Sequence, residues 1–122
     1  MDRLFLAVVA LIFIAYGVAC ALDPNLPARL AGLRIASGDG YAEMSAMYGG
    51  LQVGVGLFCA LGALRGRLRQ PALLLLLLAI GPLAVLRAVG VLRTEDVVSV
   101  YSWGALGFEA AVTLIAALLL RR

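Results

Sequence analysis

Four long apolar stretches separated by short polar segments form the main pattern of this chain. The stretches are residues 4–22, 41–64, 72–92 and 97–120. A helix that rises 1.5 Å per residue needs about twenty residues to cross a hydrocarbon core about 30 Å thick, and each stretch is about that long. The pattern therefore predicts an all-α fold, a four-helix transmembrane bundle, with residues 1–122 forming a single integral membrane domain.

The first stretch has one alternative interpretation, a cleaved signal peptide. Residues 19–21, Ala-Cys-Ala, have the small side chains of a cleavage site, and Cys20 is compatible with a lipoprotein. However, Asp2 offsets the charge of Arg3 in the amino-terminal region, and the apolar run is long for a signal peptide. We therefore interpret residues 4–22 as the first membrane span.

The connecting segments contain residues that begin and end helices. Residues 27–33 combine apolar side chains such as Leu30 and Leu33 with Arg29, which predicts a short amphipathic helix at the membrane interface. Asp39 precedes the second span and Thr94 precedes the fourth. Because short polar side chains satisfy the free N–H groups at a helix start, we expect Asp39 and Thr94 to cap these helices.

The composition supports a membrane protein and excludes several kinds of catalytic and metal-binding group. Apolar residues make up 64% of the chain, whereas soluble domains are nearer half apolar. All ten basic residues are arginine, and histidine and lysine are absent from the sequence. This composition excludes histidine acid–base chemistry, histidine metal ligation and lysine Schiff bases. We predict no metal site, no cofactor and no catalytic residues.

The distribution of arginines predicts the orientation. Four spans place both termini on one side of the membrane. That side holds Arg3, Arg65, Arg67, Arg69, Arg121 and Arg122, whereas the other side holds Arg29, Arg34 and Arg93. By the positive-inside rule we expect both termini in the cytoplasm. The basic charge then reflects membrane orientation rather than nucleic-acid binding. The Ala, Leu, Gly and Arg bias is typical of a GC-rich bacterial genome, and we expect the protein in a bacterial inner membrane.

The second span carries small and polar residues on two faces. Glu43, Ala46, Gly50 and Gly54 fall on one face of a regular helix, while Tyr48 and Gln52 fall roughly opposite. Small residues four apart allow another helix backbone to come close inside lipid. The residues predicted to mediate helix packing are Ala46, Gly49, Gly50, Gly54 and Gly56.

Three isolated charges in the apolar stretches form the strongest candidate site. Charges inside a membrane are costly and are usually paired within the protein. We expect Arg87 to pair with Glu109, with Glu43 or with both. Side chains at compatible depth would complete this buried polar centre or ligand-binding site: Tyr16, Tyr48 and Gln52. The same charges serve equally well to fix helix order and register, without binding a ligand.

The cysteines are not expected to form a disulfide. Cys20 lies near the outer end of the first span and Cys59 near the inner end of the second. Disulfides require Cα atoms within about 7 Å, which this topology does not allow. We therefore predict two buried thiols.

The order of these motifs resembles one known family. Glu43, the run Tyr48-Gly49-Gly50-Leu51-Gln52, Arg87 and Glu109 together resemble the small bacterial membrane family catalogued as domain of unknown function 4345. The resemblance covers nearly the whole chain. It implies a four-helical fold, distantly similar to DoxX-like membrane proteins, and it implies no particular activity.

Three functional hypotheses follow. The leading one is a non-catalytic accessory subunit or lipophilic-ligand binder, in contact with membrane lipids and forming a homo-oligomer or joining a larger membrane complex. The second is a small proton-coupled transporter using Glu109, although small multidrug exporters carry their glutamate in the first helix and this chain has none there. The third is a membrane enzyme acting on a lipid or quinone, with Glu43 or Glu109 as acid or base.

Overall fold

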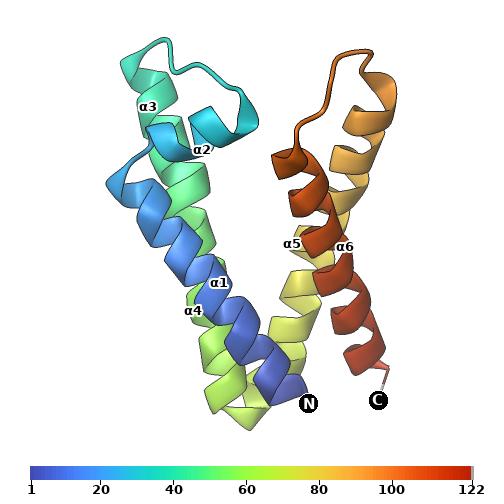
Figure 1. Cartoon of the computed structure of the whole chain (residues 1–122). Coiled ribbons are helices and arrows are strands. Elements are labelled where there is room, and N and C mark those ends of the chain that lie inside the picture. The colour runs from blue at the N-terminus through green and yellow to red at the C-terminus, as the bar shows by residue number, and fades with distance from the viewer. Residues whose placement is uncertain (122) are drawn as a thin grey trace. The chain divides into compact units, whose positions relative to one another are not determined.

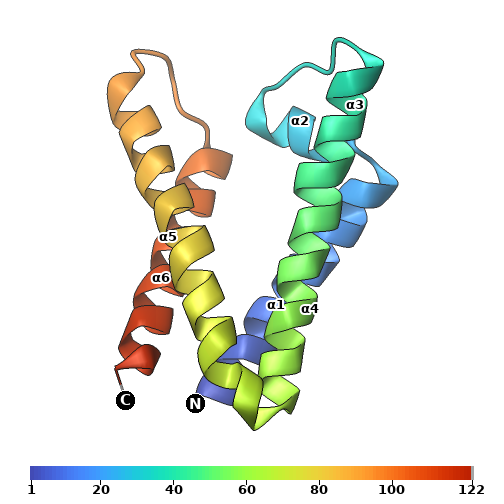
Figure 2. The same ribbon diagram turned by 180° about the vertical axis from the view of Figure 1, so that it is seen from behind.

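The computed structural model describes residues 1–121, so Arg122 of the predicted charge balance lies outside the described residues. The described chain is helical and has no strand (Figures 1 and 2). Its elements are α1 (Asp2–Leu22), α2 (Asn25–Ala31), α3 (Gly38–Met44), the π-helical turn η1 (Ser45–Gly50), α4 (Leu51–Leu64), the 3₁₀ turn η2 (Gly66–Leu68), α5 (Arg69–Arg93) and α6 (Val100–Leu120). The chain divides into two compact units, of which the first comprises Met1–Arg69 and the second begins at Gln70.

Four helical stretches are long and apolar enough to cross a membrane. They are α1, the continuous stretch Gly38–Leu64, the stretch Gly66–Arg93 and α6. The prediction of an all-α chain with four membrane-spanning helices is therefore confirmed. The boundaries differ by a few residues, because polar residues beside the apolar runs extend the second and third helices, while the fourth begins only at Val100.

In the first unit, α1 and α4 run antiparallel and approach each other closely at two glycines. A Cβ added to Gly56 would lie 2.9 Å from the Ile14 nitrogen and 3.0 Å from the Ala10 oxygen. One added to Gly17 would lie 2.8 Å from the Val53 nitrogen. These distances are to backbone atoms, which cannot move aside as a flexible side chain can. Glycine is therefore required where the two helices touch.

The second span is continuous but not a regular α-helix. Between α3 and α4, residues Ser45–Gly50 form the π-helical turn η1. A π-helical turn holds an extra residue, which rotates the upstream side chains by roughly 100° relative to a regular helix. The predicted stripe of Ala46, Gly50 and Gly54 lies on an exposed face of this span. The buried glycines of the span are Gly49, Gly56 and Gly62.

The predicted short helix is present but lies two residues earlier than predicted. α2 spans Asn25–Ala31 and ends where Gly32 adopts a left-handed backbone with φ 70°. Arg29 of α2 reaches back to the end of α1, where its Nη2 lies 2.7 Å from Oδ2 of Asp23. Oδ1 of Asp23 accepts a hydrogen bond from the backbone N–H of Asn25 at 3.1 Å. One carboxylate therefore fixes the turn between α1 and α2.

Both capping predictions were wrong. Ser37, not Asp39, caps α3, because its Oγ accepts the N–H of Gly40 at 3.2 Å while Asp39 already lies inside the first turn. Oγ1 of Thr94 accepts a hydrogen bond from the backbone N–H of Asp96 at 3.1 Å, so Thr94 stabilises a turn that lies before the start of α6 at Val100. The residue preceding α6 is Ser99, whose side chain makes no capping hydrogen bond.

The second unit is the hairpin of α5 and α6. Buried positions recur every three or four residues on each helix, as expected for two packed helices. They include Leu73, Leu76, Ile80 and Ala84 on α5 and Val112, Ala116 and Leu119 on α6. A Cβ added to Gly81 would lie 3.3 Å from Cγ2 of Thr113, so the two helices are also close at this level.

Candidate functional site: a buried ion pair

The candidate site is built from one residue on each helix of the second unit. Arg87 lies in the last third of α5, and Glu109 lies near the middle of α6. Glu109 is 6% exposed, and it is the one buried charged residue among residues 1–121. A buried carboxylate needs a compensating charge, because burial removes the water that would otherwise solvate it.

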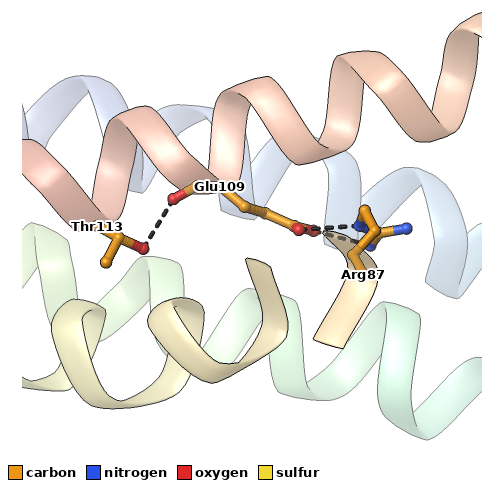
Figure 3. Close-up of polar contacts among 3 residues, drawn as sticks. All are labelled: Arg87, Glu109 and Thr113. Carbon is orange, nitrogen blue, oxygen red and sulfur yellow. Dashed lines mark hydrogen bonds and ion pairs between the residues drawn. The ribbon is translucent and has the colours of Figure 1, made fainter. Parts of the chain in front are cut away.

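Arg87 supplies that charge through two parallel hydrogen bonds (Figure 3). Its Nε donates to Oε2 of Glu109 at 2.8 Å, and its Nη2 donates to Oε1 at 2.7 Å. This bidentate arrangement matches the planar fork of the guanidinium to both carboxylate oxygens. Such charge-assisted pairs are roughly twice as strong as neutral hydrogen bonds. The predicted pairing of Arg87 with Glu109 is present in the structure.

Thr113 extends the contact one turn along α6. Its Oγ1 donates to the backbone oxygen of Glu109 at 2.8 Å, as Figure 3 shows. The methyl group of the same threonine faces Gly81 of α5. The pairs Arg87–Glu109 and Gly81–Thr113 are therefore successive contacts along one antiparallel hairpin. Together they set the register of α5 against α6.

The two charged side chains differ in exposure. The Glu109 side chain is 8% exposed and the Arg87 side chain 27%. The guanidinium thus covers the carboxylate from the more open side, and both carboxylate oxygens already accept hydrogen bonds. The arrangement is suited to neutralising and positioning a charge. A general acid or base would instead present a carboxylate oxygen toward a substrate.

The remaining predicted members of the polar centre belong to the first unit. Tyr16 of α1, Tyr48 of η1 and Gln52 of α4 are partly buried, whereas Glu43 of α3 is exposed. Each hydrogen bond just described for Arg87 goes to Glu109. It stays a prediction that Arg87 shares one polar centre with Glu43, Tyr16, Tyr48 and Gln52.

The predicted packing residues divide into two groups. Gly49 and Gly56 are buried against α1, where a Cβ at Gly49 would lie 3.1 Å from the Ala21 Cα. Ala46, Gly50 and Gly54 are exposed, and a Cβ added to Gly50 or Gly54 meets nothing within 4 Å. Gly49 and Gly56 are seven residues apart and share the face toward α1, whereas Ala46, Gly50 and Gly54 recur every four residues on another face.

Sequence reasoning missed Gly17, which lies at the centre of the α1 contact. A glycine in a helix interior costs about 1 kcal/mol relative to alanine, so its presence in an otherwise apolar helix indicates a close approach.

Cys20 and Cys59 are both buried and free. Among the described residues, no group of three His, Cys, Asp or Glu side chains is placed to hold a metal ion.

Fold and site together describe a polytopic α-helical protein with four helices able to cross a membrane and a buried arginine–glutamate pair. The chain belongs to the family described as Domain of unknown function (DUF4345), whose sequence model matches residues 1–120. The predicted resemblance to this family is confirmed. No curated protein and no solved structure matches the chain.

Proposed function

We propose that this protein is a non-catalytic accessory subunit of the bacterial inner membrane, which binds another copy of itself or a larger membrane complex. The observation that carries the proposal is the closed Arg87–Glu109 pair. Both oxygens of the buried carboxylate accept hydrogen bonds from one guanidinium, at 2.8 and 2.7 Å. The pair uses its hydrogen-bonding capacity to join α5 to α6, which is a structural task.

The outward face of the second span supports a partner. Ala46, Gly50 and Gly54 are exposed, and the space beside the two glycines is open to at least 4 Å. A glycine has no side chain for lipid tails to contact. A second helix, however, can bring its backbone close to such a face and gain van der Waals contact. This face is therefore better suited to another transmembrane helix than to lipid alone.

A proton-coupled transporter remains the second candidate, because Glu109 is a carboxylate inside a membrane-spanning helix. Proton exchange there would require breaking both hydrogen bonds to Arg87 in every cycle. Glu109→Gln removes the exchangeable proton but keeps the side-chain size. Loss of proton-coupled uptake in this variant, with retained assembly, would favour transport over the accessory role.

Native mass spectrometry of gently extracted protein tests the proposal. We expect the wild type to carry a stoichiometric partner chain, and Gly50→Leu to lose at least nine-tenths of it, about 1.4 kcal/mol of binding free energy. Gly107→Leu is the matched control, since Gly107 of α6 is also a helical glycine with nothing within 4 Å. A wild type that is strictly monomeric without a co-purifying chain would contradict the proposal.

A further inference from the structure

Three arginines gather at the turn that closes the first unit. Arg65, Arg67 and Arg69 fall within five residues around η2. The sequence has no acidic residue between Glu43 and Glu95, so this turn lacks a local counter-charge. Arg65 and Arg67 are exposed, whereas Arg69 is partly buried. The turn is therefore a concentrated positive charge at the end of a membrane span.

These arginines differ from the paired arginines of the chain. Arg29 bonds Asp23, and Arg87 bonds Glu109, each at 2.7 Å. Within residues 1–121, the three arginines of the η2 turn make no ion pair of this kind. In addition, Nε of Arg69 is buried and has no hydrogen-bond partner. Because this nitrogen is enclosed by the protein, an anion at the turn would meet the exposed guanidinium groups of Arg65 and Arg67 instead.

Exposed apolar side chains lie beside the same turn. The antiparallel pairing of Gly56 with Ala10 and of Gly49 with Ala21 places the start of α1 against the end of α4. Leu4 of α1 is 70% exposed and Leu64 of α4 is 71% exposed. Figures 1 and 2 show the N-terminus of α1 next to the α4 end of the first unit. Positive charge and apolar surface are thus adjacent, which complements a molecule with an anionic head and an acyl chain.

From this juxtaposition we infer that the η2 turn binds the phosphate of an anionic membrane phospholipid. The exposed guanidinium groups of Arg65 and Arg67 donate to the phosphate oxygens, and Arg69 adds positive charge beside them. Guanidinium groups suit this task because their fixed fork matches phosphate oxygens. The acyl chains of the same lipid lie along Leu4 and Leu64. A free phosphate ion would use the cations and leave these leucines without a role.

Lipid retention by the full-length protein tests this inference. The protein is reconstituted into nanodiscs of phosphatidylcholine containing a minority of phosphatidylglycerol, and retained lipids are identified by native mass spectrometry after detergent transfer. We expect preferential retention of phosphatidylglycerol. Arg67→Gln should weaken retention about tenfold or more, as expected for loss of a charge-assisted hydrogen bond. Arg67→Lys keeps the charge but lacks the planar guanidinium fork, and should also reduce retention.

Arg34→Gln is the matched control, because Arg34 is an exposed arginine without an ion pair in the loop between α2 and α3. It should retain phosphatidylglycerol like the wild type. Equal loss in Arg34→Gln and Arg67→Gln, with helicity preserved, would show that net charge alone attracts the lipid and would overturn the inference. Displacement of the lipid by inorganic phosphate would also overturn it, in favour of a free-phosphate site.

Discussion

At the scale of single residues, the Arg87–Glu109 pair is the most consequential interaction in the chain. Breaking a buried ion pair leaves one charge uncompensated, and typically costs about 3–5 kcal/mol. We therefore expect Arg87→Ala to lower the free energy of unfolding by that amount, measured by denaturant titration in mixed micelles. The expected loss reflects the unpaired Glu109 carboxylate, whose side chain is 8% exposed.

The double variant Arg87→Met with Glu109→Leu separates the cost of an unpaired charge from the value of the pair. Replacing both partners by apolar residues is often neutral or stabilising in protein interiors. We expect the double variant to recover most of the stability that Arg87→Ala loses. A double variant as unstable as the sum of its single variants would contradict this interpretation, because it would show that the charges act independently.

Neighbouring glycines of α4 provide a sharp contrast. At Gly56 an added Cβ would lie within 3.0 Å of two backbone atoms of α1, so Gly56→Ala should destabilise by about 1–3 kcal/mol. At Gly54 the added Cβ meets nothing, so Gly54→Ala should be neutral or stabilising by up to about 1 kcal/mol. Unfolding titrations of the two variants check the difference. Equal effects would mean that α1 and α4 do not approach each other as described.

Asp23 links pH to the turn between α1 and α2. The hydrogen bond from Arg29 holds the pKa of the Asp23 carboxyl below its ordinary value of 3.8. A lowered pKa means that the ionised carboxylate stabilises the folded turn above about pH 3.8. That stabilisation is lost as the pH falls through the lowered pKa. An NMR titration of the carboxyl carbon should show the low pKa in the wild type and a return toward the ordinary value in Arg29→Gln.

Arg34→Gln is the control for the titration, and it should leave the Asp23 pKa unchanged. The Asp23–Arg29 pair is half exposed, with side-chain exposures of 46% and 61%. Salt should therefore raise the Asp23 pKa toward its ordinary value, because exposed pairs are screened. If neither Arg29→Gln nor added salt changes the Asp23 pKa, Arg29 is not the cause of the lowered pKa.

Single residues differed in how well the sequence predicted them. Arg87 and Glu109 were predictable as partners, because charges in apolar helices are rare and require compensation. The caps were not, because Ser37, Asp39, Thr94 and Ser99 all have short polar side chains near helix starts. Which of them caps depends on where the helix begins, and a shift of two or three residues changes the answer.

At the scale of elements, the apolar runs predicted all four spanning helices, because the thickness of the membrane fixes their length. The π-helical turn η1 was not predicted. Its sequence, Ser45–Gly50, is compatible with a regular helix, and the extra residue is visible only in the backbone structure. The packed face of the second span therefore had to come from the structure, since Gly49 and Gly56 are packed while Gly50 and Gly54 are not.

The end of α2 makes a prediction of its own. Gly32 has φ 70°, a backbone conformation that costs other residues roughly 1–2 kcal/mol. Gly32→Ala should therefore loosen the α2–α3 loop and speed its cleavage by a protease in micelles. Gly38→Ala is the control, because Gly38 has no positive φ and an added Cβ there meets nothing within 4 Å. Equal cleavage of the two variants would contradict the role assigned to Gly32.

At the scale of the whole molecule, composition and four apolar runs were enough to define a membrane protein. They were not enough to decide which helix faces meet other helices. Lipid tails are as apolar as leucine, so an apolar face does not distinguish lipid from a neighbouring helix. The family match over residues 1–120 agrees with the predicted class and supplies no activity. Function therefore has to be argued from the ion pair and the open helix face.

The most direct test of the account is native mass spectrometry of the wild type and of the Arg87→Met, Glu109→Leu double variant, each extracted gently from its own membrane. If the ion pair is structural, the folded double variant keeps the same partner at the same stoichiometry as the wild type. If the folded double variant instead loses a bound chain or a lipophilic ligand, the pair is a functional site and the structural role assigned to it is wrong.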